Sequence, residues 1–304
     1  MQNSTATSEN CPLPSSIPSP PPLPPPPPLL IKPNPSVKDC KSSKGLKVLK
    51  KSPKEDIISA VRHITYHFYV ENPSDMVSLY YPILPVIQEG RCCGIVALSM
   101  ASQLIINMLP DDILSSAKHL NFTREGEMFS AYNMAELART LLNCDAIVID
   151  NLYDHKEDVL NAICDGCPLL IPYDADKNHF PCSNNGITAH WAVISGLGFT
   201  VCNKKIISTL SESEVIRNYP ELNIFLVTDV PCIKNLLKYS DKIFLYAHQG
   251  KSKHLAAWDL NDLLESNKNM HEVTKKYNSD ELVLPPGDAL SELRNKAVLL
   301  RKRV

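Results

Sequence analysis

Prolines crowd the beginning of this sequence, and they limit which part of it can fold. Between residues 12 and 35 they alternate mainly with Ser and Leu, and they run unbroken from Pro24 to Pro28. Proline fixes φ and has no amide proton, so such a stretch favours an extended polyproline II helix over packed structure. Lysines then recur from residue 38 to residue 54. We therefore predict a disordered proline-rich and lysine-rich leader over residues 1–54 and a folded domain over residues 55–304.

The composition of the chain gives no sign of a strongly charged partner. Its 304 residues are 44% hydrophobic, and 31 basic against 33 acidic side chains leave a net charge of −2. That balance does not call for nucleic acid or an anionic membrane. No apolar run approaches the roughly 20 residues of a membrane helix, and the polar start does not resemble a signal peptide. We expect a cytoplasmic protein whose ten cysteines stay reduced.

Helical periodicity dominates the first half of the expected domain, and short apolar runs dominate the second. Helices are predicted over residues 55–70, 93–108, 111–120, 133–142 and 156–164. Strands are predicted over residues 146–149, 169–173, 191–194, 224–227, 243–246 and 282–284. Helices that come first and strands that come later predict an α+β fold.

Cys93 is the candidate nucleophile of the chain. It precedes Gly94 at the start of the predicted helix 93–108, where free amide N–H groups and the helix dipole favour the reactive thiolate. The Cys93 amide can donate to an oxyanion, as can the side chain of Gln88 five positions earlier. Gly94 would leave room for a substrate backbone. The neighbouring Cys92 is the less favoured choice, and a buried structural cysteine is the alternative interpretation.

His190 is the candidate base, and Asp259 is the candidate for the group that orients it. His190 immediately precedes an apolar strand, which would hold its ring at a fixed place, and Trp191 beside it can exclude water. Asp259 ends a predicted strand before a helix over residues 261–265, so its carboxylate can point back toward the imidazole. The same aspartate can equally serve as the N-cap of that helix.

These residues occur in longer motifs that resemble a known family. A Cys-Gly pair that opens an apolar helix, a later His-aromatic-Ala-Val-Ile strand and a later Asp resemble the papain-like bacteriocin-processing peptidases. The resemblance to the actin maturation proteases is closer and covers most of residues 80–300, together with the proline-rich leader. The motifs that carry it lie at residues 88–90, 93–94, 126–130, 168–174, 189–193 and 249–252. Gln88 is one position closer to the cysteine than the oxyanion glutamine of most papain-like enzymes.

The resemblance implies a fold, an activity and partners. The fold would be papain-like, with the long nucleophile helix packed on an antiparallel sheet from the second half. The activity would be cysteine-type aminopeptidase action that removes an acetylated first residue, Met or Cys, from immature actin and exposes its acidic N-terminus. The leader would bind profilin through the segment from Pro20 to Pro28 and so bring profilin–actin to the enzyme. No metal or organic cofactor would be needed.

Other interpretations stay open at the level of sequence. The domain could be a different thiol hydrolase, such as an isopeptidase that acts on a ubiquitin-like tail. It could also be a non-enzymatic adaptor whose leader binds polyproline-recognising domains. Cys164 and Cys167 have the Cys-x-x-Cys spacing of zinc and redox sites, but they lack a second pair, so a helix end and turn is the more ordinary interpretation.

Overall fold

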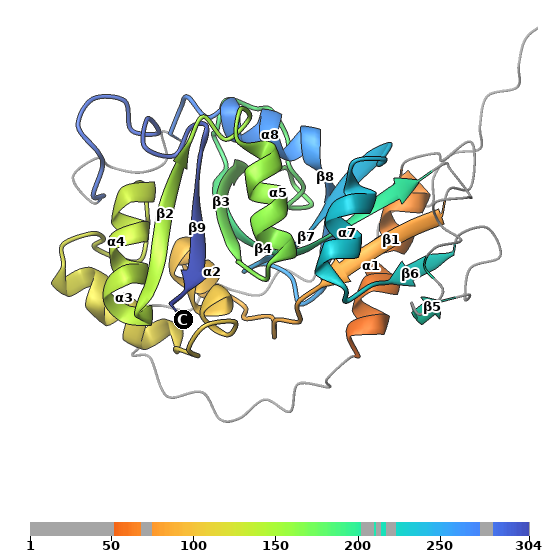
Figure 1. Cartoon of the computed structure of the whole chain (residues 1–304). Coiled ribbons are helices and arrows are strands. Elements are labelled where there is room, and N and C mark those ends of the chain that lie inside the picture. Colours follow the sequence, from red (N-terminus) through yellow and green to blue (C-terminus); the bar gives the residue numbers. More distant parts are fainter. Residues whose placement is uncertain are drawn as a thin grey trace, which may run out of the picture. The chain divides into compact units, whose positions relative to one another are not determined.

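A computed structural model describes residues 52–67, 75–201, 210, 214–216, 223–273 and 282–303 (Figure 1). Contacts divide the chain after Leu49, and all described residues belong to the second unit, Lys50–Val304. Nearly all of the predicted leader, including Pro20 to Pro28, lies outside the described residues. The leader therefore stays a prediction, as does the domain boundary at residue 54.

Helices and strands are interspersed along the described chain. The helices are α1 (Pro53–His67), α2 (Cys93–Ser102), α3 (Pro110–His119), α4 (Ala131–Leu142), α5 (Lys156–Cys164), α7 (Val230–Leu237) and α8 (Leu260–Lys268). The strands are β1 (Asp75–Tyr80), β2 (Cys144–Asp150), β3 (Leu169–Asp174), β4 (Ala189–Val201), β5 (Glu214–Ile216), β6 (Ile224–Leu226), β7 (Lys242–Gln249), β8 (Ala256–Asp259) and β9 (Lys296–Lys302).

Strand β4 is the hub of a single, mostly antiparallel sheet. One edge of β4 pairs with β3 over its first half and with β1 over its second half, while the other edge pairs with β7. The sheet continues through β9 to β2 on one side and through β6 to β5 on the other, and β8 pairs with β7. The pairing between β1 and β6 is parallel. The long strand β4 thereby fixes the positions of elements from both halves of the sequence.

Helices cover both faces of the sheet, because side chains of successive strand residues point to opposite faces. On one face, Ala192 and Ile194 of β4 pack in a core with α5, α7 and α8. On the other face, Trp191 and Val193 pack with α2, α3 and α4. In Figure 1, α5 lies in front of the sheet and α2 lies behind it. A third core lies between α1 and the strands β7 and β8.

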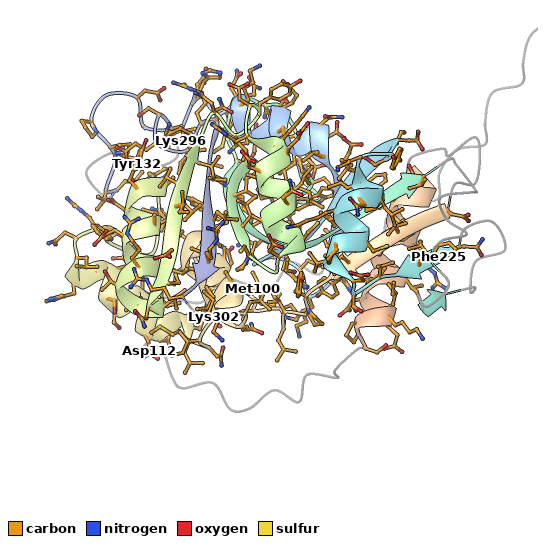
Figure 2. All side chains as sticks on the ribbon, in the orientation of Figure 1. Met100, Asp112, Tyr132, Phe225, Lys296 and Lys302 are labelled. Atoms are coloured by element: carbon orange, nitrogen blue, oxygen red, sulfur yellow. The ribbon has the colours of Figure 1, made fainter. Side chains whose placement is uncertain are left out.

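Helix α2 is buried on all sides, as its uniformly apolar sequence requires. Every residue from Gly94 to Ser102 is buried, and Met100 is labelled in the interior of the molecule in Figure 2. Asp112 of α3, also labelled there, is by contrast exposed. A helix without a solvent-facing side gives the residue at its start a rigid support.

The predicted α+β arrangement, with the helix that begins at Cys93 packed on a mostly antiparallel sheet, is confirmed. Two details differ. Helix α2 ends at Ser102 instead of residue 108, because Ser99 Oγ donates to the Met108 carbonyl and Ser102 Oγ accepts from the Met108 amide. These side chains give the backbone partners other than a continued helix. The predicted strand over residues 282–284 is wrong, since that segment has no strand pairing.

None of the helices in the described part of the chain combines the length and apolarity needed to cross a membrane.

Candidate active site

Cys93 is the first residue of α2 and lies in a pocket beside strand β4. Cys92 is the N-cap residue of the helix, but its side chain makes no capping hydrogen bond. The amide N–H groups of the first turn are therefore not capped by a side chain near the Cys93 sulfur. The residue is partly exposed. Packing around the sulfur raises the pKa of Cys93, and hydrogen bonds from the backbone amides of Trp191 and Gly94 oppose that rise. The sulfur therefore lies directly against the strand that carries His190.

The structure separates the two adjacent cysteines. Cys92 turns away from the pocket: its sulfur lies 3.6 Å from the Glu125 carbonyl, and a Cβ on Gly126 would approach that sulfur to 2.5 Å. Among the described residues, Cys93 lines the pocket and Cys92 does not. The packing of Cys92 against Gly126 accounts for its absence from the lining of this pocket.

His190 is the second residue of β4 and lines the same pocket as Cys93. Its ring meets that of Tyr173 edge-on, with centroids 5.8 Å apart, and stacks with that of His179 at 6.1 Å. Burial, together with the charges of His179 and Lys251, lowers the pKa of His190 to about 4, against a raising effect from a hydrogen bond with the Gln249 side chain. The imidazole is therefore neutral at physiological pH.

His179 is held in an uncommon backbone conformation beside this ring. Its φ is +65°, in the left-handed region that non-glycine residues rarely adopt. Asp176 fixes the turn, because its carboxylate accepts from the amides of Asn178 and Phe180 at 2.8 Å. The Tyr173 hydroxyl donates to the His179 carbonyl at 3.1 Å. These contacts keep a second imidazole stacked on the candidate base, and no local motif around His179 predicts that position.

Gln88 also lines the pocket, as expected for an oxyanion donor. Its backbone amide donates to the Gly250 carbonyl, and its side-chain Nε2 donates to the Gly90 carbonyl, both at 2.8 Å. The carboxamide nitrogen carries a second N–H that is available to a ligand. A Cβ on Gly250 would lie 2.8 Å from Gln88 Oε1, so a side chain at position 250 would displace the Gln88 carboxamide. The positive φ of Gly90, +67°, shapes the short connection from Gln88 to Cys93.

Asp259 is not brought to His190. It pairs with Phe244 of β7, which pairs in turn with Gly198 of β4, eight residues beyond His190. At a rise of about 3.3 Å per strand residue, the two sites lie on the order of 25 Å apart along the sheet. The Asp259 carboxylate accepts from the Asn261 amide at 2.8 Å. The structure thus favours the alternative interpretation of Asp259 as the N-cap of α8.

The pocket has a volume of about 240 Å³ and a mixed lining. Apolar side chains form much of its wall: Met128, Phe129, Trp191, Leu282 and Leu293. Arg91 and Lys251 contribute positive charge to the lining. This arrangement suits a ligand that has an apolar group and a nearby negative charge.

The acidic residue of the lining, Glu127, is committed to the protein backbone. Its carboxylate accepts from the amides of Arg124 and Glu125 at 2.9 Å and from the Val283 amide at 3.3 Å. Burial alone would raise the pKa of Glu127, but the hydrogen bonds outweigh burial and lower it. The carboxylate therefore joins two walls of the pocket.

Gly94 does not provide the space for a substrate that its sequence position suggested. A Cβ there would lie 2.8 Å from the Met128 Cβ, so the missing side chain makes room for the protein's own wall. The same wall is fixed to β4, because Trp191 Nε1 donates to the Met128 carbonyl at 2.8 Å. The absence of a side chain at Gly94 therefore lets the Met128 wall of the pocket pack closely against α2.

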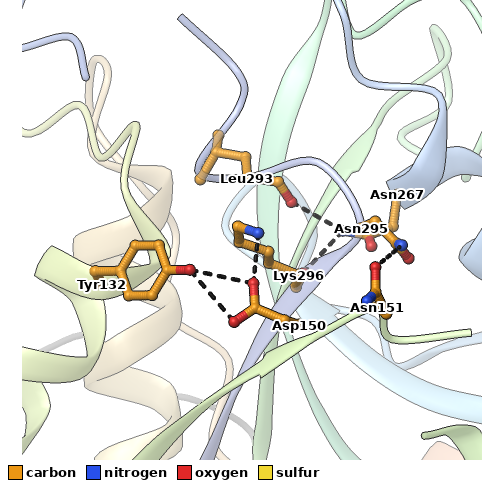
Figure 3. A network of polar contacts seen from close by, with 7 residues as sticks. All are labelled: Tyr132, Asp150, Asn151, Asn267, Leu293, Asn295 and Lys296. Atoms are coloured by element: carbon orange, nitrogen blue, oxygen red, sulfur yellow. Dashed lines mark hydrogen bonds and ion pairs between the residues drawn. The ribbon is translucent and has the colours of Figure 1, made fainter. Parts of the chain in front are cut away.

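A polar network fixes the wall that contains Leu293 (Figure 3). The buried Asn267 donates through Nδ2 to the carbonyls of Leu293 and Lys296, and also to that of Pro172 at 2.7 Å. Lys296 pairs with Asp150, which also accepts from the Tyr132 hydroxyl. The network therefore ties α8, β2 and α4 to the segment that precedes β9.

The Cys-x-x-Cys pair lies away from the pocket. Cys164 and Cys167 are both buried in the core beneath α5, and burial raises the pKa of Cys164 to about 11. No group of three or more His, Cys, Asp or Glu side chains suited to a metal occurs within the described residues.

Comparison with known proteins identifies the family. The profile described as "Actin maturation protease-like, C-terminal domain" matches residues 83–198, a stretch that contains Gln88, Cys93 and His190. The actin maturation protease of Danio rerio is 33% identical over 235 residues, which cover 73% of this chain and 72% of that protein. The chain belongs to the actin maturation protease family. The family members from Xenopus tropicalis and Homo sapiens are 35% and 34% identical, and the matches cover 74% and 63% of those proteins.

Membership of this family makes the chain a peptidase. Among solved structures, a C39-like peptidase from Bacillus anthracis is matched over 74% of this chain and 98% of that one, with 13% identity and a TM-score of 0.39.

Proposed function

We propose that this chain is a cysteine aminopeptidase that removes the acetylated first residue, Met or Cys, from immature actin. One observation carries the proposal: Cys93, at the start of α2, and His190, near the start of β4, line the same pocket. A thiol and an imidazole in one pocket, contributed by a helix start and a strand start, supply a nucleophile and a general base. The names of the relatives supply the substrate.

The proposed reaction proceeds through a thioester. His190 takes the proton of Cys93, and the thiolate attacks the carbonyl carbon of the acetylated first residue. The Cys93 amide and the Gln88 side chain donate to the oxyanion. His190 then gives the proton to the departing amine of the shortened actin chain. Water hydrolyses the thioester, releases the acetylated amino acid and restores the thiol.

The lining of the pocket supports a substrate of this chemistry. The apolar wall suits a Met or Cys side chain with its acetyl cap, and a volume of about 240 Å³ suits a short chain end. Arg91 and Lys251 would favour the acidic residues that follow in actin. In this proposal the cations select the substrate and the apolar wall receives the residue that leaves.

The test is cleavage of an acetylated actin N-terminal peptide by the full-length protein, followed by mass spectrometry. Cys93→Ala is expected to abolish release of the first residue and to keep the thermal unfolding midpoint close to that of the wild type. Cys92→Ala is the matched control, because it removes a neighbouring thiol that does not line the pocket. Cleavage by the Cys93→Ala variant would refute the mechanism. Cleavage of ubiquitin conjugates instead of the actin peptide would indicate an isopeptidase, and failure to cleave either substrate would favour an adaptor.

The proposed partner of the leader is profilin, bound through Pro20 to Pro28, and the proposed location is the cytoplasm. Profilin bound to actin would raise the local substrate concentration at the enzyme. Deletion of residues 1–49 should then slow processing of profilin–actin and leave cleavage of the free peptide unchanged. Equal rates on profilin–actin with and without the leader would exclude this role.

A further inference from the structure

We propose that Gln249, rather than Asp259, is the positioning residue that orients the His190 imidazole. This inference deepens the proposed cysteine-peptidase function and rests on it. It places a neutral carboxamide where many thiol hydrolases have a carboxylate, and it gives a role to the last residue of β7.

The sheet register places Gln249 next to His190. Gln249 is opposite Ala192 in the antiparallel pair of β7 and β4. His190 is two residues before Ala192, so the side chains of His190 and Gln249 point to the same face and are diagonal neighbours. Diagonal neighbours across an antiparallel pair lie about 7–8 Å apart at Cα, within reach of a long side chain.

The side chains of Gln249 and His190 are both buried, and each has hydrogen-bonding capacity that the other can use. Gln249 is 5% exposed and His190 is 8% exposed, and the buried His190 Nε2 has no hydrogen-bond partner within the described residues. Gln249 Oε1 accepts from the Lys251 amide at 2.7 Å, which fixes the orientation of the carboxamide. That oxygen has a second lone pair, so it can also accept from an imidazole N–H. Such a bond sets the tautomer and the angle of the ring.

The charged and titratable groups around His190 offer no competing orienter. They are Cys93 from α2, Tyr173 from β3, His179 from the loop after β3, Lys251 from the turn after β7 and Arg91 from the pocket lining. The nearby carboxylates of Glu127, Asp174 and Asp176 are each bound to backbone amides. His179 and Lys251 both disfavour a protonated His190, and the interaction with Gln249 favours it. A neutral orienter lets the ring stay uncharged until it takes the proton from the thiol.

Three substitutions test this role in the full-length protein. Gln249→Ala should lower kcat on the order of 100-fold with KM nearly unchanged, because the base loses its alignment. Gln249→Glu keeps an acceptor oxygen at the same reach, so kcat should recover toward the wild-type value. The added negative charge should also move the acid limb of the kcat/KM profile to higher pH, by one pH unit or more. Gln103→Ala, which removes an amide bound to Leu84 outside the pocket, is the control and should keep wild-type kinetics.

A merely structural role would lower the melting temperature of the Gln249 variants without moving the acid limb. An unmoved limb in Gln249→Glu, or an unchanged kcat in Gln249→Ala, would overturn the proposal. So would a loss of kcat in Asp259→Ala as large as that in Gln249→Ala.

A second readout does not depend on the substrate. Iodoacetamide alkylation at Cys93, located by peptide mapping, reports the thiolate fraction. Gln249→Glu should accelerate alkylation at neutral pH, because a stabilised imidazolium stabilises the thiolate. If the actin peptide is not cleaved but this acceleration is observed, the substrate assignment fails and the role of Gln249 stands. An unchanged alkylation rate would count against Gln249 itself.

Discussion

Acid should destabilise this fold through histidines that are buried without charge. His248 of β7 is 1% exposed, bonds the Tyr80 hydroxyl through Nε2 at 3.1 Å and lies outside the lining of the catalytic pocket. Burial lowers the pKa of His248 to about 4, from 6.5 for a histidine in an unfolded chain. Because the folded pKa is the lower one, the unfolded state binds the proton more readily. Stability is therefore full above about pH 6.5 and is lost as the pH falls toward 4.

The size of this effect follows from the gap between the two pKa values. At ~1.4 kcal/mol per pH unit, the gap corresponds to about 3 kcal/mol of unfolding free energy for His248, with about 2.5 kcal/mol of it lost by pH 4.5. Burial also lowers the pKa of His190 to about 4, so His190 should contribute a similar loss. Together the two histidines remove a large fraction of the stability of a typical domain.

Urea unfolding of the full-length protein between pH 7.5 and pH 4.5 measures this loss. His248→Gln keeps a polar group for Tyr80 but cannot take up a proton. Its unfolding free energy should fall by about 2.5 kcal/mol less than that of the wild type over this range. His254→Gln, which removes an exposed imidazole from the segment after β7, is the control and should follow the wild type. Equal losses in His248→Gln and the wild type, or an NMR titration of His248 near 6.5, would refute the reasoning.

Three further predictions concern residues that support the fold around the site or line the pocket. Asp174→Ala should cost about 3 kcal/mol in thermal unfolding, because its fully buried carboxylate accepts three backbone amides of the loop before β4, which would lose their partner. Gly196→Ala should prevent correct folding, as judged by circular dichroism, since its Cβ would lie 2.4 Å from the Leu79 carbonyl oxygen. Lys251→Gln should raise KM several-fold for an acidic actin peptide, but not for a peptide with neutral residues in place of the acidic ones; equal changes for both peptides would exclude charge recognition.

Much of the fold could be predicted because its elements carry local signals. Helix α5 has the predicted bounds, residues 156–164, and α3 and α4 agree within two residues at each end. Strand β1 was missed because its sequence, Asp75–Tyr80, includes a serine in place of a uniform apolar run. The buried Ser78 hydroxyl is satisfied by the Tyr246 hydroxyl at 2.7 Å, a contact that only the assembled sheet provides. Pairing across the sheet thus decides what a local pattern leaves open.

The candidate site shows the same division between local and long-range information. Cys93 and His190 could be selected because each begins an element with a strong apolar signal. Gln249 could not, because its place beside His190 depends on the register of β7 against β4. Asp259 could be predicted as an orienting residue because it is a carboxylate near a strand end, but the β7–β8 pairing places it far along the sheet from His190. The motif at residues 249–252 contains Gln249, but the motif alone does not show that this residue lies beside His190.

The complete burial of α2 has a consequence for how selectivity can diverge among related enzymes. The helix contributes its first residue to the pocket, while the walls come from the loops around residues 123–130, 175–188 and 282–293. Substitutions in those loops can reshape the preference for a leaving residue without moving the attacking sulfur. An electrophilic inhibitor directed at Cys93 would accordingly have to gain its selectivity from groups that reach these loops.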